Sequence, residues 1–68
     1  MKPHGEKYFV KQIDDGWLVK CEKPSPAGYL YRNKENAIET GKFLAEENHA
    51  ELIVQKKDGD IIQKISFN

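Results

Sequence analysis

The 68-residue sequence has few of the features that mark an established class of protein. Its single cysteine, Cys21, cannot close a disulfide within the chain, so packing must stabilise the fold, and a reducing, cytoplasmic location is expected. The longest apolar runs span only three residues, such as 52–54, which is far too short to cross a membrane. The first residues also lack the apolar stretch of a secretory signal.

Net charge is absent as well, because 11 Lys and Arg residues balance 11 Asp and Glu residues. This balance counts against a protein that binds nucleic acid through a strongly basic surface. No repeat, linker or low-complexity tract divides the chain. We therefore expect a flexible N-terminal lead-in over residues 1–7 and one small domain over residues 8–68.

Alternating apolar and polar residues predict five β-strands. Asp-Gly pairs at 15–16 and 58–59 are typical of tight hairpin turns, because glycine readily adopts positive φ. A loop with two prolines, over residues 23–28, separates the first hairpin from a short third strand. The predicted strands cover residues 8–13, 17–22, 29–31, 52–55 and 61–67.

One amphipathic helix is predicted from Lys34 to about Asn48. Asn33 precedes it and is a good N-cap residue, because its side-chain carbonyl can accept hydrogen bonds from the first turn. Gly41 lies on the apolar stripe and is expected to mark a close approach to the sheet. The C-terminal stop is weak, since Asn48 tolerates the left-handed conformation better than His49 does.

The order βββαββ predicts an α+β fold, a two-layer sandwich with one helix on one face of a mainly antiparallel sheet. The order of the strands stays open, as does the inward-facing side of the first strand. The predicted core comprises Val10, Trp17, Val19, Cys21, Tyr31, Ala37, Ile38, Gly41, Leu44, Ala45, Leu52, Val54 and Ile61.

Several short motifs follow one another along most of the chain. They are Asp15-Gly16-Trp17, Val19-Lys20, Lys34-Glu35, Ala37-Ile38, Ala45, Ala50-Glu51-Leu52, Val54, Asp58-Gly59, Ile61 and Ser66-Phe67. Their order and spacing resemble domain-of-unknown-function family 2188, over about residues 8–67. This resemblance implies a small bacterial or phage protein without an assigned activity, and it supplies no catalytic residue.

The sequence departs from the family pattern in two ways. His49 replaces a helix-ending glycine and Asn33 replaces a threonine at the helix start, both of which are capping changes expected to have little effect. In addition, Phe43, Ile62 and Ile65 occupy positions where the family pattern leads us to expect polar residues. On the helical wheel Phe43 lies far from the apolar stripe, so the helix period places it in water.

No constellation of residues indicates an enzyme, a metal site, a cofactor or a small-molecule ligand. Cys21 shares a strand face with apolar residues, whereas reactive thiolates need nearby positive charge. His4 and His49 are far apart in the chain, with no further ligands at the spacing of a metal site. The paired carboxylates fall in turns or on the polar helix face, where turn chemistry and solubility explain them.

The leading hypothesis is a protein-interaction module, either a homodimer or a domain that binds an unidentified protein partner. One helix covers only one face of the sheet, yet apolar residues are predicted on the other face as well. The alternative is a monomer in which long Lys and Glu side chains cover these residues. The candidate interface residues are Phe43, Leu18, Leu30, Ile53, Ile62 and Ile65.

A second hypothesis is weak nucleic-acid binding through the open sheet face. Aromatic residues such as Tyr29, Tyr31 and Trp17 would stack on unpaired bases. The basic residues expected to line one face and contact phosphates are Lys20, Lys64, Arg32 and Lys57. Against this, acidic residues are interleaved throughout the sequence. The aromatic residues are also the largest side chains available to a small core.

Overall fold

The structure, a computed structural model, describes residues 7–22 and 28–67. Apart from Lys7, the predicted lead-in lies outside the described residues, and so do residues 23–27 of the proline-containing loop. The described part contains one helix and five strands in the predicted order βββαββ. These elements are β1 (Lys7–Ile13), β2 (Gly16–Cys21), β3 (Tyr29–Tyr31), α1 (Lys34–Glu47), β4 (Glu51–Gln55) and β5 (Ile61–Ser66).

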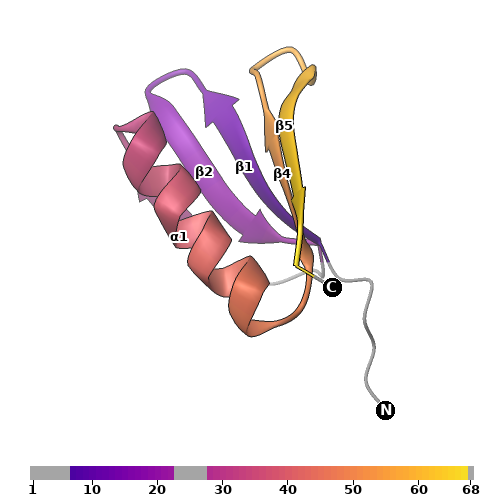
Figure 1. The fold of residues 1–68 in the computed structure, drawn as a ribbon. Helices are drawn as coiled ribbons and strands as arrows, with labels where there is room; N and C mark the ends of the chain where they lie inside the picture. The colour runs from indigo at the N-terminus through magenta and orange to yellow at the C-terminus, as the bar shows by residue number, and fades with distance from the viewer. Residues whose placement is uncertain (1–6, 23–27, 68) are drawn as a thin grey trace.

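The strands form one mixed, mostly antiparallel sheet in the order β3-β2-β1-β4-β5, and α1 lies across one of its faces (Figure 1). β1 and β4 are parallel neighbours, and every other pairing is antiparallel. The helix connects β3 at one edge to β4 near the middle. This arrangement confirms the predicted α+β fold and settles the strand order that the sequence left open.

The core lies between α1 and the inner strands. Val10 and Val19 are paired across β1 and β2, and Leu52 and Val54 project from β4 on the same side. All four are fully buried, as are Ala37 and Ala45 of the helix. A Cβ on Gly41 would lie 2.8 Å from Val10 and from Leu52, so only glycine permits this close approach. The predicted close approach of Gly41 is therefore confirmed.

The start of the helix follows the sequence signal, whereas at its end the left-handed residue is His49 and not Asn48, which the sequence favoured. The Asn33 side chain accepts hydrogen bonds from the backbone N–H groups of Glu35 at 2.9 Å and Asn36 at 3.4 Å. At the other end His49 adopts a left-handed φ of 52°, and the N–H of Ala50 donates to the Ala45 carbonyl at 2.8 Å. This Schellman-type end turns the chain directly into β4.

The prediction that Ile61 belongs to the core is wrong, since 55% of its surface is exposed. Gln63 pairs with Val54, but the register then shifts, so that Ile61 pairs with Gln55. Simple alternation would place Ile61 and Gln63 on the same face, whereas the bulge moves Ile61 opposite a residue of the uncovered face.

Candidate protein-interaction surface

The face of the sheet turned away from α1 is called the open face. Because directly paired residues project from the same side of a sheet, the strand register fixes its membership. It combines apolar side chains with several lysines. The open-face residues are Lys7, Phe9, Lys11, Ile13, Leu18, Lys20, Glu22, Leu30, Glu51, Ile53, Gln55, Ile61, Lys64 and Ser66.

The centre of the open face is apolar and lies between lysines. Phe9 pairs with Lys20 on one side and with Ile53 on the other, and Ile53 pairs in turn with Lys64. The row across four strands therefore reads lysine, phenylalanine, isoleucine, lysine. Lys11, two residues along β1 from Phe9, adds a third positive charge on the same face.

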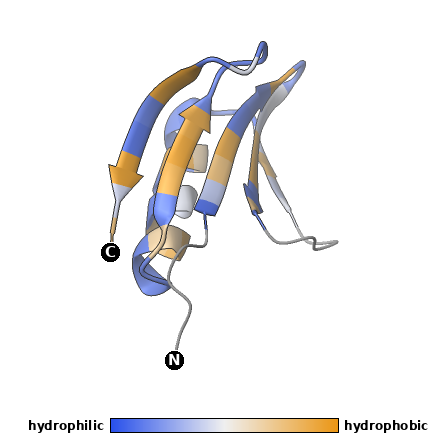
Figure 2. Cartoon of the chain, turned by 90° about the vertical axis from the view of Figure 1, so that its right-hand side faces the viewer, coloured by the Kyte–Doolittle hydropathy of each residue, from blue (hydrophilic) through white to orange (hydrophobic). Residues whose placement is uncertain are grey.

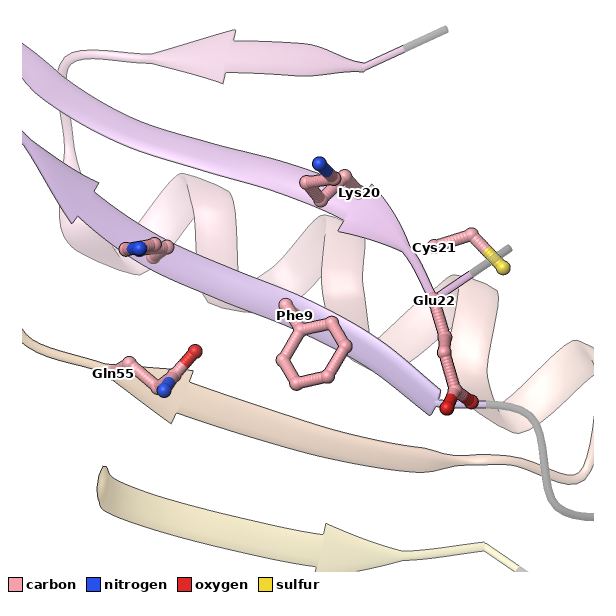
Figure 3. Close-up of a pocket in the computed structure, with 6 residues that line it drawn as sticks. Phe9, Lys20, Cys21, Glu22 and Gln55 are labelled. Atoms are coloured by element: carbon pink, nitrogen blue, oxygen red, sulfur yellow. The ribbon is translucent and has the colours of Figure 1, made fainter. Parts of the chain in front are cut away.

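A shallow hollow of about 260 Å³ surrounds Phe9. Figure 3 looks onto it from the open side, with the ring of Phe9 between β1 and β4 and Lys20 above it on β2. Pockets for drug-sized ligands usually measure about 300–1,000 Å³, so this hollow suits a single side chain better than a small molecule. Its lining residues are Phe9, Lys11, Lys20, Cys21, Glu22 and Gln55.

The six candidate interface residues do not form one patch. Leu18 is half-buried and Leu30 is 66% exposed, and the two pair on β2 and β3 at one side of the open face. Ile53 lies on the open face too, but only 6% of it is exposed because neighbouring strands flank it on both sides. The protein's own chain therefore shelters Ile53 fully and Leu18 partly.

The other three candidate residues lie elsewhere. Ile65 packs against the core, on the helix side of the sheet, where it pairs with Leu52. Ile62 is 43% exposed on β5, at the outer edge of the sheet. Figure 2 shows the apolar start of this strand as an orange segment at the edge. Phe43 is 62% exposed on the outer side of α1, as the helix period predicts.

The two sheet edges differ in how well they are protected. β3 is only three residues long. β5 has six residues, but the register shift near its start and the charge of Lys64 in its second half both discourage pairing with another strand. A larger hollow of about 570 Å³ lies beside β3. It is lined by Leu30 and by two residues of opposite charge, Asp15 and Arg32.

The charged residues are distributed unequally between the two sides of the molecule. The open face holds four lysines and two glutamates. The exposed side of α1 holds four glutamates, at 35, 39, 46 and 47, and two lysines, at 34 and 42. A chain with no net charge therefore has a more basic sheet side and a more acidic helix side.

The described residues hold no group of three or more metal-ligating side chains. Cys21 is a free, half-buried thiol at the end of β2, and His49 is exposed at the end of α1. His4 lies outside the described residues. Of the three aromatic residues considered for base stacking, Trp17 and Tyr31 pack against the core on the helix side, whereas Tyr29 is 49% exposed. The sequence already indicated that Phe9 lies on or near the face away from the helix, but Phe9 was not among the candidate interface residues, because the hollow around it forms only when β1, β2 and β4 lie side by side.

In the described part of the chain, no helix has both the length and the apolar character that a membrane span requires.

A family model described as "Uncharacterized protein conserved in bacteria (DUF2188)" matches residues 7–67. This match confirms the resemblance that the sequence motifs indicated. No curated protein and no solved structure matches the chain.

Proposed function

The chain belongs to the family of uncharacterised bacterial proteins DUF2188, and we propose that it is a protein-interaction module that binds its partner through the open face. The observation that carries this proposal is the accessible apolar part of the open face, which comprises Phe9 and the Leu18–Leu30 pair and lies beside Lys11 and Lys20. α1 packs against β1 to β4 from the opposite side and leaves this surface uncovered.

The charges define the partner's chemistry. A surface that offers an apolar side chain between carboxylates would bury that side chain in the hollow and pair its acids with the lysines. A homodimer that stacked two open faces would instead bring Lys11, Lys20 and Lys64 of both copies together. Like charges brought together in this way oppose association.

The proposed module is not an enzyme, and we place it in the cytoplasm. In the described residues, neither the free thiol of Cys21 nor the imidazole of His49 belongs to a group of three or more side chains that could hold a metal ion. The exposed carboxylates lie on the helix surface and in turns, where water screens them. A free thiol in a domain of this size is typical of proteins from reducing compartments.

A second candidate function, binding of single-stranded nucleic acid, is favoured by the lysines around Phe9. One aromatic ring with neighbouring cations is the minimal platform for a stacked base and its phosphates. Glu22 and Glu51 on the same face oppose it, and so does the acidic outer side of α1. Phe9 is also half-buried, which limits the ring area available for stacking.

An NMR titration tests the proposal against this second candidate. The probes are a short peptide with phenylalanine between glutamates, the same peptide with serine in place of phenylalanine, and an oligothymidylate. The phenylalanine peptide should shift the backbone amide signals of Phe9, Leu18 and Lys20 and bind several-fold more tightly than the serine peptide.

The matched variants are Lys20→Glu on the open face and Lys56→Glu in the β4–β5 turn, which make the same charge change at two exposed places. Only Lys20→Glu should weaken peptide binding. The proposal fails if both peptides leave the open-face signals unchanged. Tighter binding of the oligothymidylate, with a steep loss as salt is added, would support nucleic-acid binding instead.

A further inference from the structure

The outer side of α1 presents an exposed aromatic side chain among acids. Phe43 is 62% exposed. Glu39 precedes it by four residues, and Glu46 and Glu47 follow it by three and four, which are the spacings of neighbours on a helix surface. Three glutamates are therefore neighbours of Phe43 on the helix surface. Lys42, the next residue around the helix, is the nearest basic residue in sequence.

This acidic end does not serve the stability of the helix. The last turn of α1 contains no basic residue, while Glu46 and Glu47 lie close to the negative end of the helix dipole. Cations are the favourable residues at that position. At this place α1 has acids where the helix dipole favours cations, and it exposes a phenylalanine to water. Such departures from local preferences concentrate at functional sites.

The open face is complementary to this surface. Its hollow is small enough to suit one side chain, and Lys11 and Lys20 line it while Lys64 lies at the far end of the Phe9–Ile53 row. Glu22 is the one acid in the lining. An aromatic residue flanked by three acids on one side of the molecule thus matches, on the other side, a hollow at Phe9 that two lysines line, with a third lysine on the same face.

We propose that the partner of the open face is a second copy of this chain, which places Phe43 of α1 in the hollow at Phe9 and brings Glu39, Glu46 and Glu47 towards the lysines. This inference rests on the proposed function and names its partner. The contact is heterologous, because it joins two different surfaces. Each added copy therefore keeps one free surface, so the products are rings or short chains.

Sedimentation velocity over a concentration range tests the inference. With a dissociation constant between about 10 μM and 1 mM, the mean mass should rise with concentration and fall when salt is added. Phe43→Ser should weaken association at least tenfold without unfolding the domain, because Phe43 is largely exposed. Lys42→Ser, at the neighbouring exposed position, is the matched control and should leave association within about twofold.

Charge reversal provides a sharper test. One triple variant carries Glu39→Lys, Glu46→Lys and Glu47→Lys, and the other carries Lys11→Glu, Lys20→Glu and Lys64→Glu. Each variant alone should remain monomeric, and an equimolar mixture should associate again, because every contact between unlike variants restores opposite charges. A single cooperative urea-unfolding transition in each triple variant separates lost association from lost folding.

Three results would overturn the inference: a monomeric wild type up to about 1 mM, unchanged association of Phe43→Ser, or a mixture of the triple variants that stays monomeric. Loss of association in Ile62→Lys alone, with Phe43→Ser unaffected, would assign the contact to the edge of β5. If the wild type is monomeric but the phenylalanine peptide still binds the open face, this inference fails while the proposed function stands.

Discussion

The two faces of the sheet are built from alternate residues of the same strands, yet they became different surfaces. On the helix side, small and branched residues such as Val10 and Val19 are fully buried under Ala37, Gly41 and Ala45. On the open side, long side chains such as Phe9 and Lys20 border a shallow hollow. The helix lies on the side with the small residues, because these allow α1 to approach the sheet closely. The bulky residues and lysines of the open side would keep a helix away from that face.

The comparison is sharpest at β4, where neighbouring residues face opposite ways. Leu52 is fully buried under α1, and Ile53 is almost as buried on the open side, with strands on both flanks. In the middle of the sheet, flanking strands shelter a side chain even without a helix. The open face is therefore accessible mainly toward β2 and β3, and this is where Leu30 is exposed.

The largest expected effect comes from truncating one leucine on each face. Leu52→Ala should lower the free energy of unfolding by about 2–5 kcal/mol, because it leaves a cavity under the helix. Leu30→Ala, the same change at an exposed position, should alter it by no more than about 0.5 kcal/mol. Urea denaturation followed by tryptophan fluorescence measures both.

A domain of 68 residues is expected to have a total stability of roughly 3–10 kcal/mol, so Leu52→Ala is close to the limit of what the fold tolerates. A loss in Leu30→Ala equal to that in Leu52→Ala would show that the open face is part of the core. The distinction between the two faces would then be wrong.

The next effect concerns the closeness of the helix to the sheet. Gly41→Ala should destabilise the domain by about 1–3 kcal/mol, because the added methyl group meets Val10 and Leu52 at 2.8 Å. Helix propensity alone predicts the opposite, a gain of about 1 kcal/mol. Lys42→Ala, one residue along on the exposed side, is the control and should change little. A stabilised Gly41→Ala variant would mean that the helix lies farther from the sheet.

The smallest effect is expected at the end of the helix. His49 adopts a left-handed φ of 52°, a conformation that glycine reaches without steric strain. His49→Gly should therefore raise the free energy of unfolding by about 1 kcal/mol and the melting temperature by a few degrees. Asn48→Gly, at a residue with negative φ, should not stabilise the domain. Equal stabilisation by both variants would contradict this explanation.

Local signals in the sequence predicted much of the fold. Asn33 caps α1 as expected, and both Asp-Gly pairs lie between the paired strands of hairpins. The alternation of Tyr29, Leu30 and Tyr31 agrees with their register partners on β2. These features depend on neighbours in the sequence, so the residues themselves were sufficient to predict them.

The candidate surface was less predictable. The sequence suggested Ile53 and Ile65 as interface residues, but neither is freely accessible. The exposure of Ile53 depends on the two strands beside β4, and that of Ile61 depends on a register shift between β4 and β5. Strand order and register are long-range properties, so alternation within one strand did not reveal them.

By itself the sequence determined the elements, the N-cap of α1, the close approach at Gly41 and the exposed position of Phe43, because these follow from backbone conformation and residue periodicity. Only the tertiary structure decided that β1 and β4 lie side by side, which gathers Phe9, Ile53 and their flanking lysines into one surface. The pairing of distant strands is a collective result of packing. The charge pattern of the open face therefore appears only once the sheet has formed.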